Sequence, residues 1–259
     1  MCDLPDTSSI IRLENVSMSY NTPLSEVEAI NNISFDIKKN EFVSIVGSSG
    51  CGKSTILSII SGLLKPTAGK VYYKNKQVLS TNNDMGYMLQ HDHLFPWCSV
   101  LENVCIGLKI RNLDNKLNRQ RVISMLNTYG LGEFINSFPR ELSGGMRQRV
   151  ALVRTLALDP EVLLLDEPFS ALDYQTRIKV SDDIASIIRS KRKTAILVTH
   201  DISEAISLSD RVIILSKRPA TIRSIIKINL ESSHDVPSRR KSVKFAKYFD
   251  QIWEEMNNE

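Results

Sequence analysis

The run GSSGCGKST, residues 47–55, has the residue types and spacing of a phosphate-binding loop. It fits the pattern G-x-x-x-x-G-K-[ST] and lies between the apolar segment FVSIV and a helical pattern of apolar residues. Glycines allow a tight turn that points backbone N–H groups at phosphate oxygens, and the next helix adds its positive N-terminal end. We expect Lys53 to reach the β and γ phosphates of a triphosphate and the Ser54 hydroxyl to bind Mg²⁺. The residues expected around the phosphates are Gly47, Ser48, Ser49, Gly50, Cys51, Gly52, Lys53, Ser54 and Thr55.

An acidic segment, VLLLDE at residues 162–167, ends an apolar run in two carboxylates. Such a run is typical of a strand buried on both faces, so the carboxylates are expected at a strand end. Asp166 is placed to hold Mg²⁺, directly or through water, and Glu167 to polarise the attacking water as a general base. Alone, this pair is a common strand terminus with surface acids. Beside a phosphate loop, it indicates phosphoryl transfer.

A second glycine segment, LSGGMRQRV at residues 142–150, lies before another helical pattern. Ser143, Gly144 and Gly145 are therefore expected near a helix N-terminus, where unpaired N–H groups attract an anion. A serine and two glycines before a helix most often form only a capped turn. The chain already has a phosphate loop, and no lysine or metal-binding residue directly follows this second segment.

The elements that must position these residues predict an α/β fold. Alternating residues at 13–20 and 33–37 are typical of half-buried strands and predict an antiparallel opening. Short, continuous apolar runs predict a parallel sheet covered by helices. These runs lie at 42–46, 162–166, 194–200 and 211–216. Between about residues 91 and 160 the strand signal is weak, which predicts a helical insertion.

Three further elements are expected from apolar spacing. The helix after the phosphate loop should bury Ile56, Ile59, Ile60 and Leu63. A strand after Pro219 is expected from Ile222, Ile226, Ile228 and Leu230. A C-terminal helix should present one apolar face made of Phe245, Phe249, Ile252, Trp253 and Met256.

The composition sets broad limits on function. The chain has 259 residues, 42% of them hydrophobic, and a net charge of +4 from 33 basic and 29 acidic residues. This balance does not argue for nucleic acid, and no apolar run approaches the ~20 residues that span a bilayer. The four cysteines form no C-x-x-C pair, and the first residues lack a secretory pattern. We expect free thiols and a cytosolic protein that reaches a membrane only through a partner.

Taken together, GSSGCGKST, LSGGMRQRV, LLLDEP, SALD and a strand that ends at His200 resemble the nucleotide-binding subunits of ATP-binding cassette (ABC) transporters. The resemblance covers residues 11–218 as the ATPase domain and leaves 219–259 as a small C-terminal extension. It implies a P-loop NTPase (RecA-like) core with an antiparallel β subdomain and an α-helical subdomain inserted at about residues 91–160. It also implies ATP and Mg²⁺ as cofactors.

In this family two cassettes pair head to tail, so each ATP lies between the phosphate loop of one subunit and the LSGG segment of the other. The resemblance thus implies a homodimer in which Ser143, Gly144 and Gly145 bind the partner's nucleotide. Tyr20 resembles the residue that stacks on adenine, although the stretch NTPLSEVEA after it reads as a longer link than a tight turn. A half-buried strand tyrosine is the alternative.

Three other positions resemble family residues. Gln90 closes the apparent strand MGYML and resembles the glutamine that senses Mg²⁺ and the attacking water. This implies a metal set of Ser54, Gln90 and Asp166. His200 resembles the switch histidine near the γ-phosphate, and Asp173 resembles the residue that couples the two sites of the dimer. For Gln90 the alternative is an ordinary polar residue at a strand end, and for His200 it is a structural histidine.

The segments LFPWCSVLENV and KRPATI and the C-terminal IW resemble importers of nitrate, sulfonates and taurine. The resemblance implies a peripheral subunit at the cytoplasmic face of the membrane, bound to integral-membrane permease subunits. A periplasmic or lipid-anchored solute-binding protein would be an indirect partner. Leu94, Phe95 and Trp97 are suited to hold a permease helix, or they pack inside the helical subdomain. Export, or action on nucleic acid or ribosomes, is the alternative function; no nucleic acid is expected.

Overall fold

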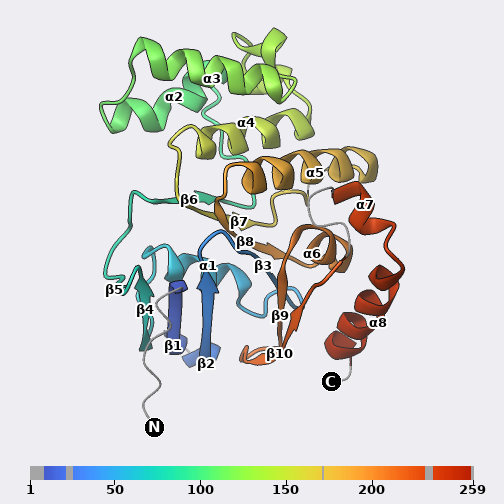
Figure 1. The fold of residues 1–259 in the computed structure, drawn as a ribbon. Helices are drawn as coiled ribbons and strands as arrows, with labels where there is room; N and C mark the ends of the chain where they lie inside the picture. Colours follow the sequence, from blue (N-terminus) through green and yellow to red (C-terminus); the bar gives the residue numbers. More distant parts are fainter. Residues whose placement is uncertain (1–8, 22–25, 171, 231–235, 258–259) are drawn as a thin grey trace. The chain divides into compact units, whose positions relative to one another are not determined.

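The structure, a computed structural model, describes residues 9–21, 26–170, 172–230 and 236–257 (Figure 1). It divides into two compact units. The first contains Met1–Asn82 and Ile184–Glu259, and the second contains Asn83–Asp183. Helix α5, Tyr174–Ser190, runs across this division.

The first unit holds an antiparallel sheet of four strands in the order β2-β1-β4-β5. Their bounds are Ser9–Asn21 for β1, Glu26–Lys38 for β2, Ala68–Tyr73 for β4 and Lys76–Gln77 for β5. Buried and more exposed residues alternate along much of β2, as expected for a strand with one covered face. The antiparallel pairing of β1 with β2 confirms the opening predicted from the sequence.

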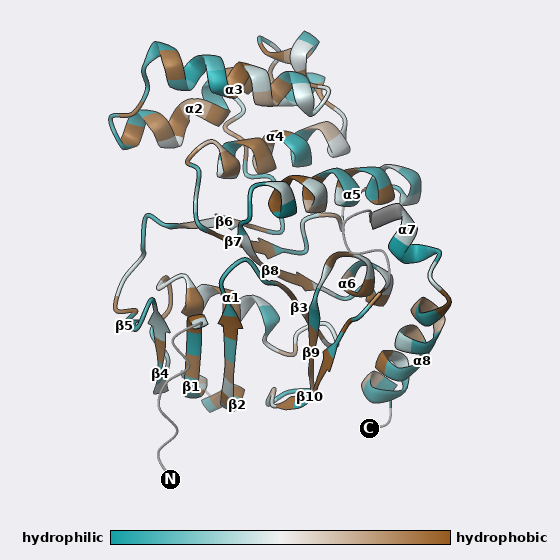
Figure 2. Cartoon of the chain, viewed as in Figure 1, coloured by the Kyte–Doolittle hydropathy of each residue, from teal (hydrophilic) through white to brown (hydrophobic). Residues whose placement is uncertain are grey.

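The same unit contains the strands that carry the phosphate loop. Strand β3, Phe42–Val46, pairs in parallel with β8, Thr194–Thr199, and with β9, Arg211–Leu215. Strand β10, Ile222–Lys227, pairs antiparallel with β9. Every residue of β3 and β8 is buried, and both strands are coloured mainly as hydrophobic in Figure 2. Full burial explains why these strands read as continuous apolar runs.

Four helices lie wholly within the described residues of the first unit. Helix α1, Lys53–Ile60, follows the phosphate loop, and α6, Ile202–Leu208, follows β8. Helices α7, Val236–Arg240, and α8, Val243–Asn257, end the chain. Because α7 and α8 both pack against α6, the C-terminal residues belong to the same compact unit as the phosphate loop.

The second unit combines a parallel strand pair with helices. Strand β6, Met85–Met88, pairs in parallel with β7, Val162–Asp166. Between them lie α2, Val100–Ile110, α3, Lys116–Thr128, and α4, Gly144–Leu156, which pack against one another, and the 3₁₀ helices Gly132–Phe134 and Pro139–Glu141. Ser99 begins α2 with a reciprocal capping box to Glu102, which satisfies two of the otherwise unpaired N–H groups.

Several expected elements differ in the structure. Strand β2 begins at Glu26, so the last four residues of the expected link NTPLSEVEA belong to a strand, and residues 22–25 of that link lie outside the described residues. Strands β4 and β5 were not expected. The first three residues of AGKVYY are all exposed, so the start of β4 shows no alternation of apolar and polar residues. Helix α1 ends at Ile60, and Leu63 lies beyond it with 56% of its surface exposed. The chain turns at Gly62, φ +78°, where a Cβ would lie 2.4 Å from the Ser80 carbonyl oxygen.

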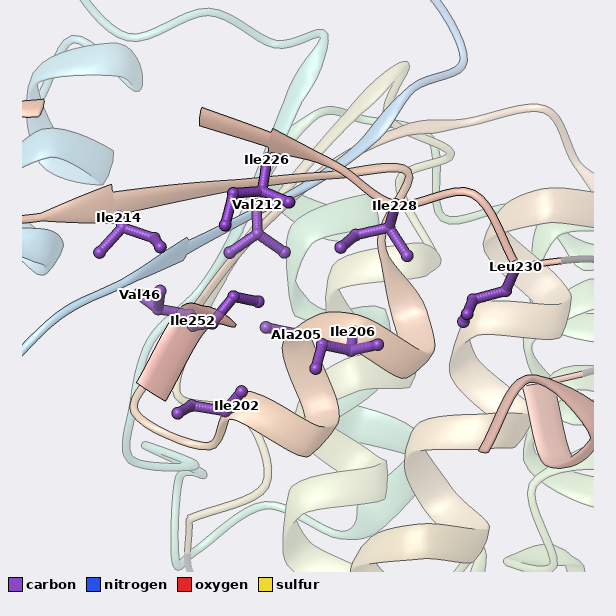
Figure 3. Close-up of a cluster of buried hydrophobic side chains, with 10 residues drawn as sticks. All are labelled: Val46, Ile202, Ala205, Ile206, Val212, Ile214, Ile226, Ile228, Leu230 and Ile252. Carbon is purple, nitrogen blue, oxygen red and sulfur yellow. The ribbon is translucent and has the colours of Figure 1, made fainter. Parts of the chain in front are cut away.

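The C-terminal helix packs into the core of the first unit through one central residue. Ile252 is fully buried among apolar side chains from strands β3, β9 and β10 and helix α6 (Figure 3). Phe245, Tyr248, Phe249 and Met256 pack around it. The expectation that Trp253 shares this face is wrong: it is 55% exposed and stacks on Phe249 with ring centroids 6.3 Å apart.

Truncating Ile252 to alanine should lower the free energy of unfolding by about 2–5 kcal/mol, because the deletion leaves a cavity in a packed cluster. Chemical denaturation followed by circular dichroism measures this change. Val243→Ala on the same helix is the control, since Val243 is 95% exposed and should alter stability by only about 0.5 kcal/mol. Equal stability of both variants would mean that α8 does not contribute to this core.

Candidate functional site

The phosphate loop in the first unit turns through two glycines with positive φ. Gly50 and Gly52 adopt φ values of +75° and +119°, a region that favours glycine. A Cβ at Gly52 would lie 3.1 Å from the Ala29 carbonyl oxygen, whereas nothing lies within 4 Å of a Cβ at Gly50. Gly52 begins α1 without a side-chain cap. The first-turn N–H groups of α1 are therefore suited to an anion.

Lys53 supplies positive charge inside this loop. Its side chain is only 5% exposed, and its ammonium group donates to the carbonyl oxygens of Gly47 at 2.9 Å and Ser48 at 2.8 Å. These acceptors hold the amine without neutralising it. A buried cation beside uncapped helical N–H groups fits the phosphates of a nucleotide.

Tyr20 lies next to the phosphate loop. It pairs with Val27 across strands β1 and β2, and its hydroxyl group is 3.2 Å from the Thr55 hydroxyl. The ring is therefore anchored at the first turn of α1, close to the phosphate loop. Stacking of this ring on adenine stays a prediction.

His200 follows β8 directly, in the same unit as the phosphate loop, and its side chain is exposed. Its two neighbours are fixed by hydrogen bonds. The Asp201 N–H donates to the Thr199 hydroxyl at 3.0 Å, and that hydroxyl donates to Glu204 at 2.7 Å. The main chain on both sides of His200 is thereby tied to helix α6.

The two carboxylates lie at the end of β7 in the second unit and differ in environment. Asp166 is 4% exposed, and the Tyr87 hydroxyl donates to it at 3.4 Å. Glu167 is more exposed, and its φ of +43° is uncommon for a residue with a side chain. A strained backbone conformation of this kind costs about 1–3 kcal/mol and is typical of functional sites.

Gln90 and Glu167 lie together, with the Gln90 amide nitrogen donating to the Glu167 carboxylate at 3.1 Å. Strand β6 ends at Met88, so the expectation that Gln90 closes a strand is wrong, and Gln90 lies in the following loop. A loop position lets the amide turn towards the end of β7. The structure thus brings the proposed general base, Glu167, into contact with the proposed water-sensing residue, Gln90.

Side chains of α4 whose role the sequence did not indicate hold the loop that carries Gln90. The buried Gln148 donates to the Gln90 carbonyl at 3.1 Å, and Arg147 forms an ion pair with Asp92 at 3.0 Å. Arg154 donates to two further loop carbonyls at 2.8 Å and 2.6 Å. The sequence contains one indication that Gln148 is buried. This polar residue lies three positions before Ala151, and residues at this spacing share a helical face, which here is buried.

Ser143 begins α4 and its side chain accepts from the Met146 N–H at 3.3 Å, so within one chain it acts as an ordinary helix cap. Asp173 similarly accepts from the Thr176 N–H at 3.0 Å, and its hydrogen bonds to the Thr176 side chain and backbone lower its pKa. Ser143 is exposed, with Gly144 and Gly145 partly exposed beside it. Contact of these residues with a partner's nucleotide stays a prediction.

The aromatic segment after Gln90 divides into two parts. Trp97 is 73% exposed, whereas Leu94 and Phe95 are half-buried, and the Phe95 N–H donates to the buried Asn103 at 2.7 Å. Internal packing thus accounts for the partial burial of Leu94 and Phe95.

No helix among the described residues is both long and apolar enough to cross a bilayer.

The chain belongs to the ABC transporter family, because residues 30–170 match the sequence profile of that family. It is an ABC-type ATPase subunit with the fold of a P-loop NTPase, as the sequence predicted. An uncharacterized ABC transporter ATP-binding protein of Bacillus subtilis is 42% identical over 251 residues, 96% of each chain. The nitrate import ATP-binding protein of Synechocystis sp. is 42% identical over 231 residues, 87% of each chain.

A solved structure of a dimeric ATP-binding cassette in a post-hydrolysis state, bound to ADP and Pi, has the same fold. It is 34% identical, with a TM-score of 0.76 over 85% of this chain and 99% of that one. Cassettes of this family bind ATP, and their dimeric structures together with the import relatives imply a dimer that works with membrane permease subunits.

Proposed function

We propose that this chain is the ATP-hydrolysing subunit of an importer for a small anionic solute such as nitrate, a sulfonate or taurine. The observation that carries the proposal is the contact between Gln90 and Glu167 at the end of a buried strand, in a chain that also has a complete phosphate loop. Similarity to a nitrate import protein supports the solute class. Nothing in the described residues favours export or action on nucleic acid.

In the proposed reaction the phosphate loop holds ATP and Glu167 activates the attacking water. Lys53 exchanges its two carbonyl contacts for phosphate oxygens, and the exposed residues Ser48–Gly50 supply N–H donors. Glu167 accepts a proton from water while Gln90 orients the carboxylate. His200 contacts the γ-phosphate, and Tyr20 stacks on adenine.

The resemblance to the family implies Mg²⁺, and the Ser54 hydroxyl, the Gln90 amide and the buried Asp166 carboxylate each offer a hard oxygen donor of the kind that this ion prefers. When bound, the ion neutralises charge that develops on the phosphates. The chain keeps one carboxylate, Asp166, buried away from water and hydrogen-bonded to the Tyr87 hydroxyl. The other, Glu167, remains available to water.

The second glycine segment acts in a head-to-tail homodimer. Ser143, Gly144 and Gly145 complete the partner's site, so the γ-phosphate bridges two chains and its loss lets the pair reopen. Such a dimer explains why the chain has two anion-binding segments. Asp173 couples the two sites.

The subunit works at the cytoplasmic face of the membrane, bound to permease subunits, with a periplasmic or lipid-anchored solute-binding protein as an indirect partner. Residues 11–218 form the ATPase domain, in which about 91–160 is the helical subdomain and 219–259 an extension. Trp97, at 73% exposure, is the strongest candidate for permease contact, with Leu94 and Phe95 beside it.

Uptake of labelled nitrate and taurine by cells that lack this gene tests the proposal. The wild-type gene should restore uptake of one such anion, and a gene with Glu167→Gln should restore none at equal protein level. Restored uptake with the Glu167→Gln gene would contradict ATP-driven import. A wild-type protein that restores no anion uptake but shows salt-sensitive, hydrolysis-stimulating binding to RNA or DNA would move the function to nucleic acid.

A further inference from the structure

Helix α6 begins immediately after His200. Asp201 caps it by accepting from the Glu204 N–H at 3.1 Å, and Thr199 on the other side of His200 donates to the Glu204 carboxylate. His200 is thus the one residue between two anchors on the same helical turn. A tilt of α6 must move the His200 main chain with it.

Helix α6 cannot fix its own position. It has seven residues, about two turns, and isolated helices shorter than about 12 residues are marginal in water. It packs against β3, β8, α7 and α8. Figure 3 shows Ile202, Ala205 and Ile206 directed into the cluster that contains Ile252 of α8.

The other end of α6 is held by two arginines. Arg239 of α7 is 3% exposed and donates to the carbonyl oxygens of Ile206, at 3.3 Å, and of Ser209, through a short hydrogen bond. Arg189 donates to the Leu208 carbonyl at 2.8 Å. These carbonyls end a helix and would otherwise lack donors, and the cations also oppose the negative end of the helix dipole.

The burial of Arg239 has a cost that these contacts must offset. Desolvation, together with the nearby charge of Arg189, lowers the pKa of Arg239 to about 10, and Asp210 opposes the shift. A guanidinium with this pKa remains charged at neutral pH. A buried cation is tolerated where it is hydrogen-bonded, as here to carbonyls at the end of α6.

We propose that Arg239 is a positioning residue for His200: by fixing the C-terminal end of α6, it sets where His200 meets the γ-phosphate. The C-terminal extension thereby becomes part of the hydrolytic machinery. This inference rests on the proposed role of His200. The phosphate loop itself should be little affected, because β3 is paired on both sides by β8 and β9.

The test compares Arg239→Met with Arg239→Lys, and Lys241→Met is the control because Lys241 is exposed in the same segment. Arg239→Met should lower kcat for ATP on the order of ten- to a hundredfold, the effect of a small misplacement of a reacting group. The affinity for a fluorescent ATP analogue should change less than about twofold, an expectation that rests on the intact pairing of β3. Arg239→Lys should restore part of kcat, and Lys241→Met should match wild type.

A chain that lacks the His200 side chain shows whether the effect of Arg239→Met on kcat depends on His200. In a His200→Ala chain, Arg239→Met should cause no further loss of kcat, because interacting residues are not additive. Equal losses in both backgrounds, or a wild-type kcat for Arg239→Met, would overturn the positioning role. If Arg239→Met does not fold, Arg239→Lys in both backgrounds decides by the same comparison. Full activity of His200→Ala alone would instead overturn the proposed role of His200, and with it that of Arg239.

Discussion

Replacing Glu167 by glutamine should lower the rate of ATP hydrolysis by about 10²- to 10⁴-fold, the usual contribution of a general base. Glutamine has the shape of glutamate but cannot accept the proton of the attacking water. Its side-chain oxygen can still accept from Gln90, so the loop and the strained turn at Glu167 should keep their geometry. ATP affinity should therefore remain near that of the wild type.

This variant also tests the dimer. With hydrolysis stopped, the γ-phosphate stays in place, and ATP with Mg²⁺ should convert the chain to a stable dimer, detected by light scattering after size exclusion. Phosphate release measures the rate, and Glu133→Gln is the control because Glu133 is exposed in the same unit. Undiminished phosphate release would remove Glu167 from its role. A monomer at saturating ATP, even with the permease added, would contradict the shared site.

The segments that the sequence located well are those whose chemistry depends on adjacent residues. The phosphate loop needs only a strand, a glycine-rich turn and a helix in succession, and the structure has β3 and α1 on either side of it. The strand before Asp166 was readable because burial on both faces leaves a purely apolar run. Local covalent order therefore fixes these elements.

The segments that the sequence missed depend on distant partners. Strand β2 is an edge of its four-stranded sheet and has only an isolated bridge from Ile30 to Ala220 beyond its pairing with β1, so Glu26 and Glu28 remain exposed and its first residues read as a polar link. The Gln90 loop is held by Gln148, which lies 58 residues away. No local pattern reports such contacts.

The C-terminal segment gives the same lesson in another form. Its amphipathic spacing predicted a helix, and Ile252 is buried as expected. The helical period alone could not show that Trp253 is exposed whereas Ile252 beside it is buried. Arg239 lies in a basic cluster that reads as a solvated surface. Its burial follows from the unpaired carbonyls at the end of α6, and these become visible only in three dimensions.

Lys53→Met should weaken ATP binding by about 2–4 kcal/mol, on the order of thirty- to a thousandfold in Kd, because it deletes a charged donor that is itself buried. Methionine keeps most of the aliphatic length and fits the buried path of the lysine side chain. The phosphates would lose their nearest cation while the helical N–H groups remain, so weak binding should persist. Titration with a fluorescent ATP analogue measures the change.

The matched control is Lys65→Met, which removes the same charge from an exposed position in the same unit and should leave Kd near the wild-type value. The salt dependence separates the two effects further. A contact in the loop should survive 0.5 M salt, where the Debye length is only a few ångströms, whereas a general surface charge is screened. If Lys53→Met and Lys65→Met weakened binding equally, the attraction would come from net charge. The geometry of the phosphate loop would then not be its source.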